Sequence, residues 1–183
     1  MREYLLGNAA IAKGLLEAGT GLAAGYPGTP SSEIIETLVE LKGDLPLHIE
    51  WSVNEKVALE VAAGASWTGC RSVATMKHVG LNVAADPFMT LAYLGVGAGL
   101  LVICADDPFC HSSQNEQDSR RYSQFASIPC LDPADPQEAR DMAVYGLELS
   151  ERFNIPVMLR PTTRVSHARA DVEVSGDRPS SGE

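Results

Sequence analysis

The chain has 183 residues, with 14 Lys and Arg against 24 Asp and Glu, which gives a formal net charge of −10 at pH 7. A domain holds roughly 100–200 residues, so this length predicts a single domain with a sizeable core. A composition that is 45% hydrophobic and 21% charged excludes an intrinsically disordered chain. The acidic balance argues against nucleic-acid binding, which needs a basic surface.

Short features of the sequence argue against export and against a membrane span. The sequence does not open with a basic and apolar leader, so no export signal is predicted. Residues 88–105 are uncharged and about the minimum length of a membrane span, but glycines at 95, 97 and 99 interrupt them. We expect a helix end, a turn and a buried strand there. The four cysteines form no C-x-x-C pair, which favours reduced thiols of a cytoplasmic protein over disulfides, zinc or an iron–sulfur site.

Hydrophobic periodicity predicts strands that alternate with helices along most of the chain. The first predicted helix has Asn8 as its N-cap, and the second has Thr29 as N-cap with Pro30 at its first helical position. The helix after Asp135 carries Glu138 at the capping-box spacing. The helix after Asp135 is expected over residues 136–153, and two further helices over residues 53–68 and 83–94. Strands are expected over residues 21–26, 48–51, 72–76, 101–105 and 157–160.

This order of elements predicts an α/β fold with three layers. A mostly parallel sheet of about six strands would be covered by helices on both faces, as the continuous apolar strands also indicate. We assign residues 1–167 to this domain. Residues 168–183 are polar and rich in turn formers, and we expect a linker or a disordered tail there.

Ligands of such sheets bind beyond the carboxyl ends of the strands. Four segments follow predicted strands at that edge, and functional residues are expected in them: residues 25–32, 52–55, 77–82 and 106–120.

Two of these segments have a structural explanation beside the functional one. Residues 25–32 are either a tight, well-capped turn or a backbone wall that touches a ligand while the Thr29 hydroxyl contacts a carboxylate. Glu55 follows Ser52 at the capping-box spacing, which makes it a helix cap. A buried carboxylate at the same place would instead hold a protonated ring nitrogen, with Glu50 as the nearest competitor for that role.

The other two segments are open to similar alternatives. Lys77 and His78 follow a strand and are either solvated or catalytic. The polar run from Asp106 is long enough to be functional or disordered. Asp106 and Asp107 leave a Mg²⁺ site open as an alternative, although the main expectation is that the chain has no metal site of its own.

Five motifs in this order resemble the pyrimidine-binding domain of thiamine-diphosphate-dependent 2-oxoacid:ferredoxin oxidoreductases, and most closely their indolepyruvate branch. The resemblance extends over residues 5–167. The motifs are GYPGTPSSE (25–33), EWSVNEKVALEVAAGAS (50–66), TMKHVGLNVAADP (75–87), ADDPFCHSSQNEQDSR (105–120) and RPTTRVSH (160–167).

The resemblance implies roles for single residues. Glu55 matches the glutamate that hydrogen-bonds the aminopyrimidine ring of thiamine diphosphate and promotes loss of the C2 proton of its thiazolium, so it is the expected catalytic residue. The expected cofactor-binding residues are Glu55, Pro27, Gly28 and Asn82. The expected substrate-binding residues are Thr29, His78, Gln114 and Asn115, with Gln117 in the same polar loop.

The resemblance also implies that a second domain or subunit binds part of the cofactor. Family enzymes bind the diphosphate and Mg²⁺ through a GDG…N-type motif of a second domain, and this sequence contains neither that motif nor the cysteines of iron–sulfur clusters. The expected partners are a diphosphate-binding (PP) domain or subunit with iron–sulfur clusters, a gamma-type subunit, ferredoxin and CoA, in a homo- or hetero-oligomer. The Ala- and Gly-rich helix after Glu55 is the expected interface. The chain alone is not expected to turn over substrate.

The expected function is therefore oxidative decarboxylation of an aryl 2-oxoacid, such as indolepyruvate, to an acyl-CoA with reduction of ferredoxin. Three alternatives remain. One is an enzyme of the same family for another 2-oxoacid, and the second is a separated, non-catalytic interaction module. The third, a flavodoxin-like nucleotide binder, depends on the fold alone and lacks a phosphate loop.

Overall fold

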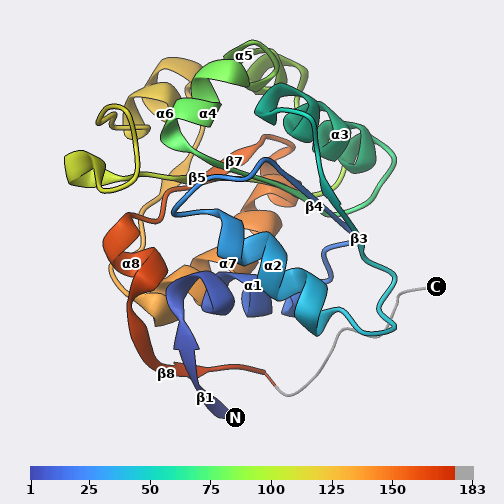
Figure 1. The fold of residues 1–183 in the computed structure, drawn as a ribbon. Helices are drawn as coiled ribbons and strands as arrows, with labels where there is room; N and C mark the ends of the chain where they lie inside the picture. The colour runs from blue at the N-terminus through green and yellow to red at the C-terminus, as the bar shows by residue number, and fades with distance from the viewer. Residues whose placement is uncertain (176–183) are drawn as a thin grey trace.

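The computed structural model describes residues 1–175, which fold around one six-stranded sheet (Figure 1). Every pair of neighbouring strands in this sheet is parallel, in the order β3-β2-β4-β5-β7-β6. The strands are β2 (Leu22–Gly25), β3 (His48–Trp51), β4 (Ser72–Lys77), β5 (Leu100–Ala105), β6 (Cys130–Leu131) and β7 (Val157–Leu159). The central β5 is apolar and fully buried along its length, as expected of a strand covered on both faces.

Helices cover both faces of the sheet and enclose a core on each (Figure 1). One face packs α1 (Gly7–Glu17), α2 (Ser32–Leu41) and α7 (Pro136–Phe153) against strand residues such as Val73 and Leu101. The other packs α3 (Glu55–Trp67), α4 (His78–Val83), α5 (Ala85–Leu94) and α6 (Arg120–Ala126), with Phe88 and Met76 among its buried side chains. The short α8 (Thr163–His167) and the 3₁₀ turn η1 (Pro108–Cys110) complete the helices in this part of the chain. The predicted fold class is confirmed.

A second, two-stranded sheet corrects the predicted domain boundary. β1 (Arg2–Leu6) pairs antiparallel with β8 (Arg169–Glu173), so the expectation of a linker or tail from residue 168 is wrong for these residues. β8 alternates exposed and buried positions, and Val172 is completely buried. Five residues with only one fully buried position give a weak apolar pattern, which explains the error. The rest of the predicted tail, residues 176–183, lies outside the described part of the chain.

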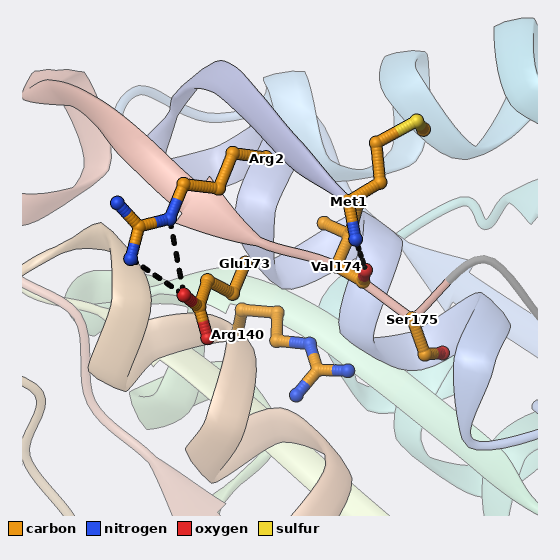
Figure 2. A pocket seen from close by; sticks show the side chains of 6 residues that line it. All are labelled: Met1, Arg2, Arg140, Glu173, Val174 and Ser175. Carbon is orange, nitrogen blue, oxygen red and sulfur yellow. Dashed lines mark hydrogen bonds and ion pairs between the residues drawn. The ribbon is translucent and has the colours of Figure 1, made fainter.

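Polar and charged groups close this small sheet at the chain ends (Figure 2). The Met1 amino group donates a hydrogen bond to the Val174 carbonyl at 2.9 Å, and the Arg2 guanidinium pairs with Glu173 at 2.6 Å. A pocket of about 470 Å³ lies here, and none of the predicted site residues lines it. Its second arginine, Arg140, is ion-paired with Glu17 and Asp141.

Val172→Ala is expected to lower the free energy of unfolding by about 2 kcal/mol, because it removes two buried methyl groups and leaves a cavity beside Ala10. The measurement is urea denaturation of the 183-residue chain. Asp171→Ala on the exposed side of the same strand is the control and is expected to change stability by less than about 0.5 kcal/mol. Equal effects of the two substitutions would mean that β8 does not belong to the folded domain.

Three predicted helix starts differ from the structure. α1 begins at Gly7 without a side-chain cap, since the buried Asn8 is used elsewhere. α2 begins at Ser32 rather than at Pro30, whose bond to Thr29 is cis. The predicted helix over 83–94 corresponds to α5, which begins at Ala85, and the separate helix α4 precedes it. The Asp135 cap is confirmed, because its carboxylate accepts a hydrogen bond from the Glu138 N–H at 2.9 Å.

The uncharged segment 88–105 folds as predicted. It contains the end of α5, a turn that starts at Gly95 with φ of +74°, and the buried strand β5. Within residues 1–175, the structure contains no helix that is long and apolar enough to cross a membrane.

Candidate active site at the carboxyl edge of the sheet

The sheet topology brings the four predicted segments to one edge. Strands β3, β2, β4 and β5 are neighbours in that order and all run parallel, so their carboxyl ends lie side by side. The chain leaves them into the turn 26–31, the link 52–54, the helix α4 and the loop 106–119. Parallel α/β sheets bind ligands at this edge.

Glu55 is a buried carboxylate without a partner. It is the first residue of α3, it is 8% exposed, and no hydrogen bond or ion pair from residues 1–175 reaches its side chain. A carboxylate removed from water in this way costs free energy unless a ligand supplies a hydrogen-bond donor. The N-terminus of α3 offsets part of this cost through the helix dipole.

The backbone of α4 lies directly against this carboxylate. A Cβ atom placed on Gly80 would lie 2.4 Å from Glu55 Oε1 and 2.8 Å from its Cδ, so no larger residue fits at position 80 without displacing Glu55. Gly80 therefore fixes one wall of the Glu55 site. The sequence analysis missed this residue, because the contact joins two helices that are separate in the sequence.

The predicted capping box at Ser52 and Glu55 is wrong. Asn54 is the N-cap of α3, and its side chain accepts a hydrogen bond from the Val57 N–H at 2.9 Å. The Ser52 hydroxyl donates to Glu50 at 2.8 Å. Since Asn54 does the capping, the Glu55 carboxylate is left for another task.

Glu50, the competing carboxylate, is already engaged. His48 Nε2 lies 3.0 Å from its carboxylate, and the Ser52 hydroxyl binds the other oxygen. The hydrogen bonds from His48 and then Ser52 lower the pKa of Glu50 below its usual value. Of the two candidates, Glu55 is the one with a free carboxylate.

Hydrogen bonds fix the turn after β2, and they do not involve the Thr29 hydroxyl. The buried Asn8 side chain donates to the Pro30 carbonyl at 2.7 Å, and the Gly28 N–H donates to the Ser32 hydroxyl at 2.8 Å. Thr29 is exposed, and its hydroxyl has no hydrogen-bond partner in the described structure. Pro27 is exposed beside it.

Lys77 connects this turn to the loop 106–119. Its side chain lies against Gly28, where an added Cβ would be 2.9 Å from the Lys77 Cδ, and its ammonium donates to the Ser112 carbonyl at 2.8 Å. Gly28 is thus a close-approach position.

His78 is enclosed within the domain rather than open to the crevice. It is 1% exposed, its Nδ1 accepts from the Asp107 N–H at 3.4 Å, and its Nε2 lies 3.0 Å from the Asn115 carbonyl. Both ring nitrogens are used inside the domain, so this arrangement leaves none for the direct substrate contact that was predicted. The predicted substrate-binding residues Gln114 and Asn115 are exposed on the loop that His78 holds.

Asp107 organises this loop from inside. It is 1% exposed and accepts hydrogen bonds from the Ser112 N–H, the Ser113 hydroxyl, the Thr163 hydroxyl and the His111 N–H, at 2.7–3.2 Å. Burial acts to raise the pKa of Asp107, but these hydrogen bonds outweigh it and lower the pKa to about 2.

Asp107→Asn is expected to show a pH-dependent loss of stability. The pKa of Asp107 is lower in the folded chain than in the unfolded one, so the ionised carboxylate stabilises the fold above about pH 4 and this contribution disappears as the pH falls toward 2. The stability difference between wild type and variant should therefore shrink by about 2 kcal/mol between about pH 5 and pH 2. Denaturant titrations of wild type and variant at both pH values measure this stability difference. A difference that is constant with pH would contradict a lowered pKa of Asp107 in the folded chain.

Asp106 belongs to a buried ion-pair network. Its carboxylate is fully buried and accepts from Arg160 Nε at 2.7 Å and from the Ser119 N–H at 3.1 Å, while Arg160 also reaches Asp132 at 3.1 Å. The alternative of a Mg²⁺ site at Asp106 and Asp107 has no support, because protein donors occupy both carboxylates. No group of three or more potential metal ligands is present within residues 1–175.

Asn82, a predicted cofactor-binding residue, is exposed near the end of α4. The Tyr122 hydroxyl donates to its Oδ1 at 2.6 Å, which leaves the amide nitrogen available as a donor. Tyr122 in turn packs edge-on against the buried Phe88. Like Gly80, Tyr122 makes a contact that is distant in sequence and that the motifs could not indicate.

The chain is similar in sequence to part of several known proteins. No family model matches it. It is 54% identical over 178 residues to indolepyruvate oxidoreductase subunit IorA from Pyrococcus abyssi. The aligned region covers 97% of this chain and 27% of that protein. The IorA subunit from Archaeoglobus fulgidus is 53% identical and covers 94% of this chain and 28% of that protein. The chain is therefore similar to about a quarter of the IorA subunit.

A more distant relative and a solved structure are also similar. The chain is 28% identical to 2-oxoglutarate synthase subunit KorA from Methanothermobacter thermautotrophicus, across 94% of this chain and 48% of that protein. A solved structure of a 2-oxoglutarate:ferredoxin oxidoreductase from Magnetococcus marinus, with 2-oxoglutarate, coenzyme A and succinyl-CoA bound, superimposes with a TM-score of 0.83 at 18% identity. It covers 95% of this chain and 32% of that one, and it supports the fold. The predicted resemblance is confirmed, and the chain spans about a quarter of the length of the curated IorA relatives that it matches.

Proposed function

We propose that this chain is the pyrimidine-binding part of a thiamine-diphosphate-dependent oxidoreductase that converts aryl 2-oxoacids and CoA to acyl-CoA, with ferredoxin as electron acceptor. The observation that carries the proposal is the buried, unpartnered Glu55 carboxylate, held against Gly80 at the carboxyl edge of the sheet. The names of the IorA relatives, at 53–54% identity, support indolepyruvate or a similar aryl 2-oxoacid as substrate over 2-oxoglutarate.

The residues present fit an aminopyrimidine ring. Such a ring presents a nitrogen that becomes a strong donor when protonated, and Glu55 offers a largely buried carboxylate without a competing partner in the described structure. Glu55 would hold the proton at this ring nitrogen, while Asn82 and the backbone of Pro27 and Gly28 would line the ring. Thiamine diphosphate, when bound, supplies the electron sink for decarboxylation of the 2-oxoacid.

Polar groups at the same edge would orient the substrate. The free Thr29 hydroxyl lies on a turn that Asn8 and Lys77 fix, and the exposed Gln114 and Asn115 lie on a loop that is held from inside. Hydroxyl and amide groups on supported backbone suit the 2-oxoacid carboxylate, because little ordering is needed when the substrate binds.

A partner polypeptide would cover this edge. Large apolar side chains are exposed in two of the segments at this edge, Val53 at 80% and Phe109 at 85%. Exposed apolar side chains in neighbouring segments are typical of an interaction surface. We propose that a diphosphate-binding domain or subunit with iron–sulfur clusters packs here and supplies the Mg²⁺ and diphosphate sites.

Three of the small residues of α3 pack inside this domain rather than at the interface expected from the sequence. Ala58, Ala62 and Ala63 are at most 2% exposed and face the core of this domain, where α3 packs on β2 and β4. The proposed interface therefore moves from the alanine face of α3 to the apolar side chains around the carboxyl edge.

A substrate panel tests the proposed function. The complex that forms around this chain in its native cells is assayed with indolepyruvate, phenylpyruvate, pyruvate and 2-oxoglutarate, in the presence of CoA and ferredoxin. We expect kcat/KM for the aryl substrates to exceed the others by at least about tenfold. Highest activity with 2-oxoglutarate or pyruvate would select the alternative of another 2-oxoacid, and no activity with any of them would favour an interaction module.

A further inference from the structure

The buried His78 ring bridges two distant points of the loop 106–119. Its Nδ1 accepts from the Asp107 N–H at 3.4 Å and its Nε2 lies 3.0 Å from the Asn115 carbonyl. A carbonyl cannot donate a hydrogen bond, so Nε2 must carry the hydrogen and Nδ1 must accept. Only the neutral ring with the hydrogen on Nε2 makes both bonds, and no other described group binds these two backbone atoms.

The loop between these points needs an internal support. Two consecutive residues that are not glycine, Phe109 and Cys110, have positive φ values of 67° and 52°. Such conformations cost about 1–3 kcal/mol each and persist only where surrounding contacts impose them. The buried side chains of His78 and Asp107 supply such contacts from the interior of the domain, while Gln114 and Asn115 remain exposed on the surface.

The same turn of α4 also contacts the Glu55 site. His78 begins α4, and Gly80, two residues later, lies against the Glu55 carboxylate. One rigid turn thus supports the loop on one side and Glu55 on the other.

We propose that His78 is a positioning residue that holds the loop 106–119 in place beside Glu55, and so sets the orientation of the substrate-binding groups on that loop. The hold on the loop is a property of this chain alone, whereas the effect on substrate binding rests on the proposed function. His78 acts through the loop and touches neither substrate nor cofactor.

Two substitutions separate the two hydrogen bonds of the ring. The side-chain oxygen of Asn lies near the place of Nδ1, so His78→Asn keeps the acceptor for Asp107 and loses the donor to Asn115. The amide nitrogen of Gln lies near the place of Nε2, so His78→Gln keeps the donor to Asn115 and loses the acceptor. His111→Asn, at an exposed position of the same loop, is the matched control.

Amide hydrogen exchange of the 183-residue chain measures the hold on the loop. We expect His78→Asn to speed exchange at least about tenfold at the Ser112 N–H, which is hydrogen-bonded to Asp107 near the Asn115 anchor, while the Asp107 N–H stays protected, and His78→Gln to do the reverse. His111→Asn should leave both unchanged. Exchange that is identical in wild type and both variants overturns the proposal. Uniformly faster exchange that includes α7 also overturns it, because it shows general destabilisation.

Kinetics of the native complex then measure the functional consequence. We expect both variants to raise KM for the 2-oxoacid by about tenfold with a smaller change in kcat and an unchanged affinity for thiamine diphosphate. A loosened loop with unchanged KM overturns the positioning role. If the wild-type complex oxidises no 2-oxoacid while the exchange pattern holds, the proposed function fails and the hold on the loop stands.

Discussion

Glu55→Gln is expected to lower the rate of 2-oxoacid oxidation by the native complex by about 10²–10⁴-fold, the range typical of a lost proton-transfer group. The glutamine has nearly the same shape and fits against Gly80, but it cannot hold the proton of a pyrimidine nitrogen as a carboxylate does. The complex should assemble normally. The measurement combines steady-state rates with the mass of the complex.

Glu50→Gln is the matched control for this prediction. Glu50 is the neighbouring carboxylate, but its oxygens are bound to His48 and Ser52, and we expect less than about a twofold change in rate. The Glu55 assignment is wrong if Glu55→Gln retains activity. It is also wrong if Glu50→Gln produces the larger loss.

Arg160→Met is expected to lower the free energy of unfolding by about 3–5 kcal/mol. The methionine fills much of the space of the arginine side chain but leaves the fully buried Asp106 carboxylate without its ion-pair partner. This is a large fraction of the roughly 5–15 kcal/mol by which domains are stable. Chemical denaturation of the 183-residue chain at neutral pH measures the loss.

Two further variants show whether the buried charge is the cause. Arg160→Met combined with Asp106→Asn removes the charge as well, and should recover part of the lost stability. Arg120→Met removes an arginine with a half-exposed side chain that pairs with Asp118 and Asp132 at the exposed edge of the network, and should cost less than about 1 kcal/mol. A loss of similar size for Arg160→Met and Arg120→Met would contradict the buried network.

The main layers of the fold could be predicted because their signals are local. β5 is a continuous apolar run, and the predicted strand 101–105 differs from the observed Leu100–Ala105 by one residue. β1, β6 and β8 were not predicted, since each has at most five residues and a half-exposed pattern that periodicity does not distinguish from a turn.

Polar residues near helix starts were the weakest basis for prediction. Asn8 and Thr29 have the side chains of N-caps, yet Asn8 binds the Pro30 carbonyl across the domain and Thr29 precedes a cis proline. Tertiary contacts decide the use of such residues, and a sequence window does not contain them.

The candidate site was predictable as a set of segments but not as a set of contacts. Parallel topology is sufficient to bring Glu55, Thr29 and the loop 106–119 to one edge, and the motifs indicated Glu55. The wall at Gly80, the enclosed ring of His78 and the Tyr122 bond to Asn82 join elements that are far apart in the sequence. These contacts emerged only from the structure.

The central claim is that this chain contributes the pyrimidine-binding side of a thiamine diphosphate site in a larger oxidoreductase. The most direct test isolates the assembly from native cells through a tag on this chain and determines its polypeptides, thiamine diphosphate and iron. We predict thiamine diphosphate in stoichiometric amount with this chain, together with an iron-containing polypeptide, and loss of aryl 2-oxoacid oxidation when the tagged chain carries Glu55→Gln. A chain that is recovered alone, without cofactor or iron even after incubation with thiamine diphosphate and Mg²⁺, would contradict the claim.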